Sequence, residues 1–192
     1  TVNNTQAALL LAEPNVASGS INITAKNEAG GSDIFLRKLL LSGYCNRLDL
    51  IGGYSRSYVE DSVEIHDSFT VTGATPRAAI GSVLSNRDYF EVRNEFHGGF
   101  IGFMAESADG PLSWSTFAKI AIGSMNQEAR VTGSSTTTVP GAGSATSPFG
   151  LLALPSNIGR FDQDEFAIIP ELNVSVRYNL SQNFQVMMGY SF

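Results

Sequence analysis

The feature that most constrains this chain is a period-two alternation of apolar and polar residues over long segments. It is clearest in residues 166–180 and 184–192, which are separated by a short polar turn at 181–183. Successive side chains of a β-strand point to opposite faces, so each segment would present one apolar and one polar face. The two segments therefore predict an antiparallel hairpin with a continuous apolar face.

The same alternation predicts more strands upstream, which brings the expected total to seven. The further ranges are 20–29, 34–41, 47–71, 89–105 and 112–130. For the fourth of these we assign Phe90, Val92, Phe96, Phe100 and Met104 to the apolar face.

Connections of two lengths separate the expected strands. Short turns are expected at 42–46, 106–111 and 181–183, and long loops at 72–88 and 131–165. Short turns on one side and long loops on the other are typical of outer-membrane barrels.

Strand length and composition together favour a membrane barrel over a soluble sheet. Several expected strands exceed the roughly five or six residues of a typical globular strand, and about ten tilted residues cross a bilayer. Only 16% of the residues are charged and lysine occurs three times, whereas soluble sheets use lysine to protect their edges. The predicted fold is an all-β, antiparallel transmembrane barrel of the bacterial outer membrane, with about eight strands. We expect one domain over 1–192, with a weakly patterned segment 1–33 and a long loop 131–165.

Charge and cysteine content exclude several other classes. Twelve basic against 18 acidic residues give a net charge of -6, which argues against a nucleic-acid partner. The single Cys45 excludes an internal disulfide and a multi-cysteine metal site. The acidic runs lack the spacing of a calcium-binding loop, and the glycine pairs are not followed by a helix, so no metal or cofactor is expected.

Several short motifs occur in the order found in a known family. They are residues 47–54 (RLDLIGGY), 88–99 (DYFEVRNEFHGG), 156–160 (SNIGR), 166–171 (FAIIPE) and 189–192 (GYSF). Over residues 34–192 the chain resembles the putative β-barrel porin-7 family, outer-membrane proteins found largely in planctomycetes. The resemblance implies an outer-membrane barrel and brings no catalytic residues with it.

The resemblance also bears on the odd strand count. Members of that family continue beyond the Gly-Tyr-Ser-Phe motif, so one interpretation is that part of the barrel lies outside this sequence. The alternative is that Phe192 is the native end and, with the alternating apolar residues before it, forms the signal of the outer-membrane assembly machinery. The two interpretations place the loop 131–165 on opposite sides of the membrane.

Two groups of residues are the candidate functional positions. A charge network is expected to face the barrel lumen and to consist of Arg47, Asp49, Glu91, Arg93, Glu95, Lys119, Glu171 and Arg177. Charges in a narrow lumen are costly unless paired, and this set is balanced. The residues expected to face lipid or form the interfacial aromatic girdles are Tyr54, Trp114, Tyr178, Phe184, Tyr190 and Phe192.

The function expected from these features is passive and not enzymatic: a porin-like channel or a structural component of the cell envelope. Its partners would be the lipid bilayer and the outer-membrane assembly machinery, and several copies could share one larger barrel. Two alternatives remain open at this point. One is a soluble secreted β-sandwich for adhesion or assembly. The other is a lipid-modifying barrel enzyme that uses a serine with His97 and Glu95.

Overall fold

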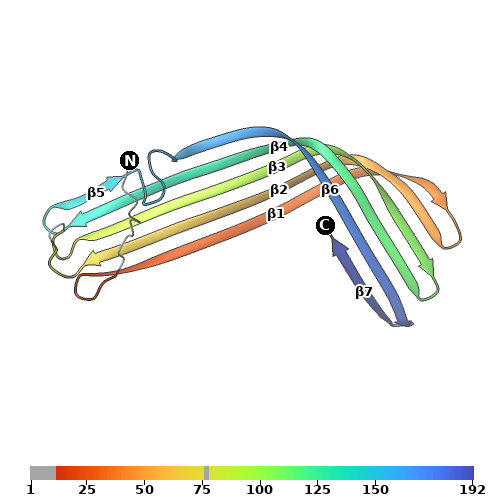
Figure 1. The fold of residues 1–192 in the computed structure, drawn as a ribbon, viewed down its shortest axis with the longest axis horizontal. Helices are drawn as coiled ribbons and strands as arrows, with labels where there is room; N and C mark the ends of the chain where they lie inside the picture. The colour runs from red at the N-terminus through yellow and green to blue at the C-terminus, as the bar shows by residue number, and fades with distance from the viewer. Residues whose placement is uncertain (1–11, 76–77) are drawn as a thin grey trace, which may run out of the picture. The chain divides into compact units, whose positions relative to one another are not determined.

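The computed structural model describes residues 12–75 and 78–192, and its regular secondary structure there is entirely β (Figure 1). The seven strands are β1 (Ala17–Ser42), β2 (Asn46–Val71), β3 (Val83–Asp109), β4 (Leu112–Val139), β5 (Gly143–Ser147), β6 (Gly159–Ser181) and β7 (Phe184–Ser191). The all-β prediction is confirmed for these residues.

The strands form one antiparallel sheet in the order β1-β2-β3-β4-β6-β7, with the short β5 paired to β4. The predicted terminal hairpin is present: Val174 lies opposite Tyr190, and Val176 lies opposite Met188. Among the described residues β1 and β7 each have one neighbour, so the sheet is not closed within this chain. The expectation of a closed barrel is therefore met only at the level of an antiparallel all-β sheet.

Strand boundaries differ most from the sequence-based ranges at two places, and β3 is also longer than its expected range 89–105. The ranges 20–29 and 34–41 belong to one strand, β1, because Gly30 and Gly31 continue the strand instead of turning it. Much of the expected loop 131–165 is also extended, since β4 continues to Val139 and β6 begins at Gly159. The threonines of this segment favour a strand through their branched side chains. Within the expected segment 1–33, residues 1–11 lie outside the described part of the chain.

The long strands pass through two compact units. Unit 1 contains the residues up to Glu28, Glu60–Arg93 and Glu128–Asp162; unit 2 contains Ala29–Val59, Asn94–Gln127 and Gln163–Phe192. Each unit is described separately below.

The two faces of the sheet in unit 2 differ in chemistry. One face, here called the Lys119 face, is identified by side chains that contact one another across strands. Its members include Asp33, Phe35, Arg37, Asp49, Ile51, Ser55, Phe96, Phe100, Ser115, Lys119, Ala121, Ile169, Glu171 and Ser175.

The alternating residues form the opposite face, here called the Trp114 face. It is lined by exposed apolar side chains, namely Ile34, Leu36, Tyr54, Ile101, Phe103, Trp114, Ile120, Ile122, Phe166, Ile168, Leu172, Val176, Tyr178, Phe184, Val186, Met188 and Tyr190. Water-soluble sheets normally bury such residues, so this distribution is inverted relative to a soluble protein.

The hydrophobic core of unit 2 lies on the Lys119 face. Ile51, Phe96, Phe100 and Ala121 form its buried centre, and Met104 packs against them. Phe96, Phe100 and Met104 therefore do not lie on the outward apolar face assigned from the sequence. In β3 that face carries Ile101 and Phe103 instead, because the alternation places odd and even positions on opposite sides.

Close contact between β3 and β4 in unit 2 depends on glycine. A Cβ added at Gly123 would lie 2.0 Å from the carbonyl oxygen of His97, and one at Gly98 would lie 2.5 Å from the carbonyl oxygen of Ile122. Both distances are shorter than any tolerated nonbonded contact, so neither position accepts a side chain without movement of the neighbouring strand. The glycines noted in the sequence thus allow adjacent strands to approach.

We predict that Gly123→Ala destabilises the protein by about 1–3 kcal/mol, because overpacking a fitted site forces backbone shifts of that cost. The free energy of unfolding in urea, measured in detergent micelles, is the readout. Gly52→Ala is the matched control, since its Cβ would lie 3.5 Å from the nearest atom, an ordinary contact. Equal stability of the two variants would show that the close approach is not required.

In unit 1 a buried carboxylate holds the segment that precedes β6. Asp88 is fully buried, and its Oδ1 accepts hydrogen bonds from the backbone N–H groups of Leu152 and Ala153 at 3.1 and 2.7 Å. Its Oδ2 accepts a third from Leu151 at 3.1 Å. One side chain thereby satisfies three consecutive donors of an irregular segment, and a buried N–H without a partner would be costly.

We predict that Asp88→Ala releases this segment, because three backbone donors lose their acceptor. Amide hydrogen exchange at Leu151, Leu152 and Ala153 should accelerate by more than tenfold, which corresponds to about 1.4 kcal/mol of local stability. Asp88→Asn retains one oxygen and should protect two of the three amides. Unchanged exchange in Asp88→Ala would contradict the assignment of this anchor.

Candidate functional site

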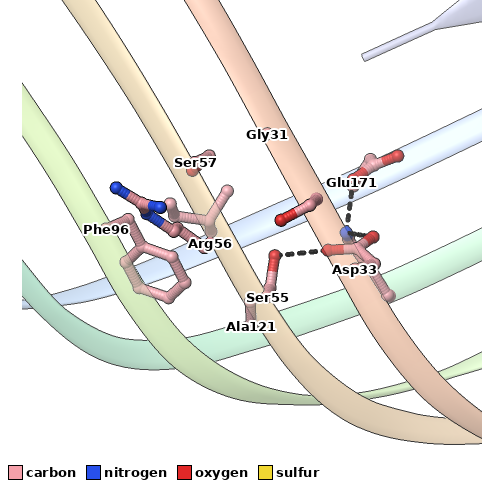
Figure 2. A pocket seen from close by; sticks show the side chains of 11 residues that line it. Gly31, Asp33, Ser55, Arg56, Ser57, Phe96, Ala121 and Glu171 are labelled. Atoms are coloured by element: carbon pink, nitrogen blue, oxygen red, sulfur yellow. Dashed lines mark hydrogen bonds and ion pairs between the residues drawn. The ribbon is translucent and has the colours of Figure 1, made fainter.

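The ammonium of Lys119 is one of the buried charged groups of unit 2, and its residue is 7% exposed. It lies on β4 and forms ion pairs with Asp33 of β1 and with Glu171 of β6, the latter at 2.9 Å. Asp33 in turn accepts a hydrogen bond from the hydroxyl of Ser55 at 2.6 Å. Figure 2 shows Asp33, Ser55 and Glu171 arranged around the pocket on this face.

A pocket of about 320 Å³ surrounds this ion-pair cluster. Its polar lining includes the charged groups and three serines, and its apolar lining includes Phe96, Ala121 and Ile169. The ammonium also lies 4.9 Å from the centre of the Phe100 ring, close enough for a cation–π interaction. Because the ammonium faces two carboxylates, it is held as a fixed charge and is poorly suited to act as a base or nucleophile.

A second ion-pair cluster on the Lys119 face is centred on Asp49, whose side chain is inaccessible to solvent. Arg47 donates from Nε to Oδ2 at 2.8 Å and from Nη2 to Oδ1 at 3.2 Å. Arg37 of β1 pairs with the same carboxylate and lies 3.7 Å from Glu106 of β3. Two guanidinium groups thus compensate a carboxylate that would otherwise be unstable in this position.

The structure divides the expected lumen network between the two sides of the sheet. Five of its members belong to the Lys119 face by contact or alternation: Arg47, Asp49, Lys119, Glu171 and Arg177. Glu91, Arg93 and Glu95 occupy β3 positions that alternate with Phe96, so they project to the opposite side.

Three residues that were not named from the sequence join the five on the Lys119 face: Asp33, Arg37 and Glu106. The eight residues together again comprise four acids and four bases. Asp33 was missed because the expected strand began at position 34, beyond an apparent turn at Gly30-Gly31. A continuous alternation through β1 would have placed Asp33 and Arg37 on one face.

The residues considered for catalysis form a separate group on the Trp114 side of unit 2. Glu95 pairs with Arg56, whose Nε lies 2.7 Å from Oε1, and with His97, whose Nε2 lies at 3.1 Å. The hydroxyl of Tyr54 lies 2.6 Å from the other ring nitrogen of His97. Both nitrogens are thus occupied by Tyr54 and Glu95, an arrangement that differs from a serine–histidine–acid triad.

The six residues expected at the lipid-facing or girdle positions are all exposed, with between 42% and 72% of their surface accessible. They are Tyr54, Trp114, Tyr178, Phe184, Tyr190 and Phe192. All occupy positions that alternate with the Lys119 face. In the described part of the chain, no group of three or more His, Cys, Asp or Glu residues could hold a metal ion. A search of the same residues finds no helix suited to crossing a membrane.

We predict that Lys119→Met lowers the free energy of unfolding by about 2 kcal/mol, because Asp33 and Glu171 lose a charged hydrogen-bond partner. Urea unfolding in detergent micelles measures the effect. Arg160→Gln removes an ion pair with Glu128 in which the arginine side chain is 65% exposed, and should change stability by less than about 1 kcal/mol. An unchanged free energy of unfolding in Lys119→Met would mean that the sheet accommodates the two carboxylates without the ammonium group.

No curated protein matches the sequence. A protein family described as putative beta barrel porin-7 matches residues 1–192. The match agrees with the long antiparallel strands, the exposed apolar face and the paired charges on the opposite face. The chain belongs to the putative beta barrel porin-7 family.

Proposed function

We propose that this chain supplies part of the wall of a passive, porin-like β-barrel in a bacterial outer membrane. The observation that carries the proposal is the inverted polarity of unit 2, in which the Trp114 face exposes apolar side chains and the Lys119 face holds paired charges. A transmembrane barrel needs this arrangement, because its outer surface contacts lipid and its interior is polar.

The aromatic residues of the Trp114 face support lipid as its environment. Trp114 follows the turn between β3 and β4, while Phe184 and Tyr178 adjoin the turn between β6 and β7. Aromatic side chains concentrate where a membrane barrel meets the interface, since their rings are apolar and their polar atoms can reach water. In the soluble-sandwich alternative a second sheet would cover this face, and the described residues form one sheet.

The Lys119 face supports a passive role. Its charged groups are paired with one another, and the pocket around Lys119 contains phenylalanine and isoleucine side chains together with the ion pairs. Such a lining can bias the passage of ions through electrostatic interactions. It can equally fill a narrow lumen, since a barrel of about eight strands is just filled by its own side chains. The proposal therefore covers a narrow channel and a structural envelope barrel.

The first test is reconstitution. Refolded into detergent micelles and left unboiled, the protein should migrate on a denaturing gel faster than the boiled sample if one copy closes the barrel, or as a larger species if several copies share it, because a closed barrel resists the detergent. It should also float with liposomes in a density gradient. Solubility in plain buffer, without flotation or a gel shift, would contradict the membrane assignment and favour a soluble sandwich.

Conductance in a planar bilayer then separates the two passive roles. A channel should show discrete current steps, and Lys119→Met should shift its ion preference towards cations, since the variant loses a positive charge beside Asp33 and Glu171. Arg160→Gln in unit 1 is the matched charge-loss control and should leave the preference unchanged. A heat-modifiable protein without current steps would identify a structural barrel.

A further inference from the structure

The strands of this protein are much longer than a bilayer requires. Strands β1 to β4 contain 26, 26, 27 and 28 residues. Each is more than twice as long as the roughly 9–11 tilted residues that cross the hydrocarbon core. If these strands cross a membrane, more than half of each must lie outside it.

The Trp114 face in unit 2 has a stretch of suitable length. On β4 it runs from Leu112 to Ile122, close to the roughly ten residues that a tilted strand needs. The positions facing this side in that stretch are Leu112, Trp114, Thr116, Ala118, Ile120 and Ile122, none of which is charged. On β1 the stretch includes Lys38, whose flexible side chain lies near the turn at 43–45 and can extend towards the interface.

A group of hydrogen-bonded polar residues ends this apolar stretch within unit 2. On β2, Arg56 lies two residues beyond Tyr54. On the antiparallel β3, His97 and Glu95 are the next positions of the same face that carry side chains after Ile101, counted towards the start of the strand. These four side chains form the cluster of ion pairs and hydrogen bonds described above. Charged groups at the edge of an apolar band are expected where the band meets water.

Positions of the same parity carry a different chemistry in unit 1. Arg87 donates to Glu64 at 2.7 Å, and Arg160 donates to Glu128 at 2.9 Å. Arg87 and Ile101 are both odd-numbered residues of β3, and Glu128 and Ile120 are both even-numbered residues of β4. Within unit 1 these positions carry charged residues, whereas positions of the same parity within unit 2 carry apolar ones.

The positions of unit 1 that alternate with these charged residues are buried or apolar instead. Here Asp88 is fully buried, and Asp67 is 1% exposed and accepts a hydrogen bond from the amide of Asn86 at 2.8 Å. The apolar residues Ile65 and Phe90 share this side with them. Unit 1 thus has the polarity of a sheet in water, with charged residues on the exposed side and apolar and buried polar groups on the other.

We propose that the bilayer contacts only the Trp114 face of unit 2, between the short turns and the Arg56–Glu95–His97 cluster, and that the strands of unit 1 continue into water. The occupant of the apolar face is the hydrocarbon core of a lipid bilayer. This inference rests on the proposed function and adds to it the position of the membrane. Short turns lie on the periplasmic side of outer-membrane barrels, so unit 1 and the 140–158 connection lie outside the cell.

The test places a nitroxide spin label at two positions of one strand that have the same parity. Ile120→Cys lies on the Trp114 face of unit 2, and Thr132→Cys is an exposed position of unit 1. Both are made in a Cys45→Ser background, labelled in the unfolded state and refolded into liposomes. Collision rates with oxygen, which concentrates in lipid, and with a water-soluble nickel complex are then measured. Ile168→Cys and Asp162→Cys repeat the comparison on β6.

The expected result is an oxygen-to-nickel collision ratio several-fold higher at Ile120 than at Thr132, with the same order at Ile168 and Asp162. High ratios at all four positions would overturn the inference while leaving the membrane function intact. Low ratios at all four positions, with no liposome flotation, would overturn both this inference and the proposed membrane function. Protection of Ile120 from both reagents, with spin–spin broadening, would mean that a second copy of the chain covers this face. Each labelled variant must retain the heat-dependent gel shift of the unlabelled protein.

Discussion

The structure depends on the requirement that each face of a single-layered sheet meet a medium that suits it. The described strands form one sheet, and no second layer covers either face within these residues. Every side chain therefore points to one of two environments, and the alternation along each strand sorts them. In unit 2 the sorting places Ile101, Ile120 and Met188 on an exposed face, which water alone would not stabilise.

Charge compensation is the second condition for this sheet. Asp49 and Lys119 are both buried, and each has two partners of opposite charge: Arg37 and Arg47 for Asp49, and Asp33 and Glu171 for Lys119. Removing such groups from water costs several kcal/mol unless the partners restore the lost interactions. The pairs link β1, β2, β4 and β6 through side chains in addition to the backbone hydrogen bonds, and this limits how the strands can slip relative to one another. The charge pairing on the Lys119 face and the register of the sheet thus have a common cause.

Much of the fold was accessible from the sequence, because period-two alternation and turn residues are local signals. They predicted the all-β class, the hairpin between β6 and β7, and the short turns near 43–45 and 110–111. They failed where the signal was ambiguous. Gly30 and Gly31 resemble a turn, yet β1 continues through them with Tyr58 beside Gly30. The expected face of β3 was incorrect in unit 2, because phenylalanines were assumed to face outward together.

The sequence by itself determined that this chain forms long antiparallel strands with few charges, since strand formation follows from the alternation of neighbouring residues. It also indicated that charges would be balanced on one side of the sheet. Only the tertiary structure decided which charges meet. Lys119 pairs with Asp33 at a separation of 86 residues, whereas Glu95 pairs with Arg56 on the opposite face. Asp33 on β1 and Lys119 on β4 belong to strands that β2 and β3 separate in the sheet. The physical reason is that their meeting depends on the register of several strands and on which face each position occupies, and neither is encoded in the local pattern.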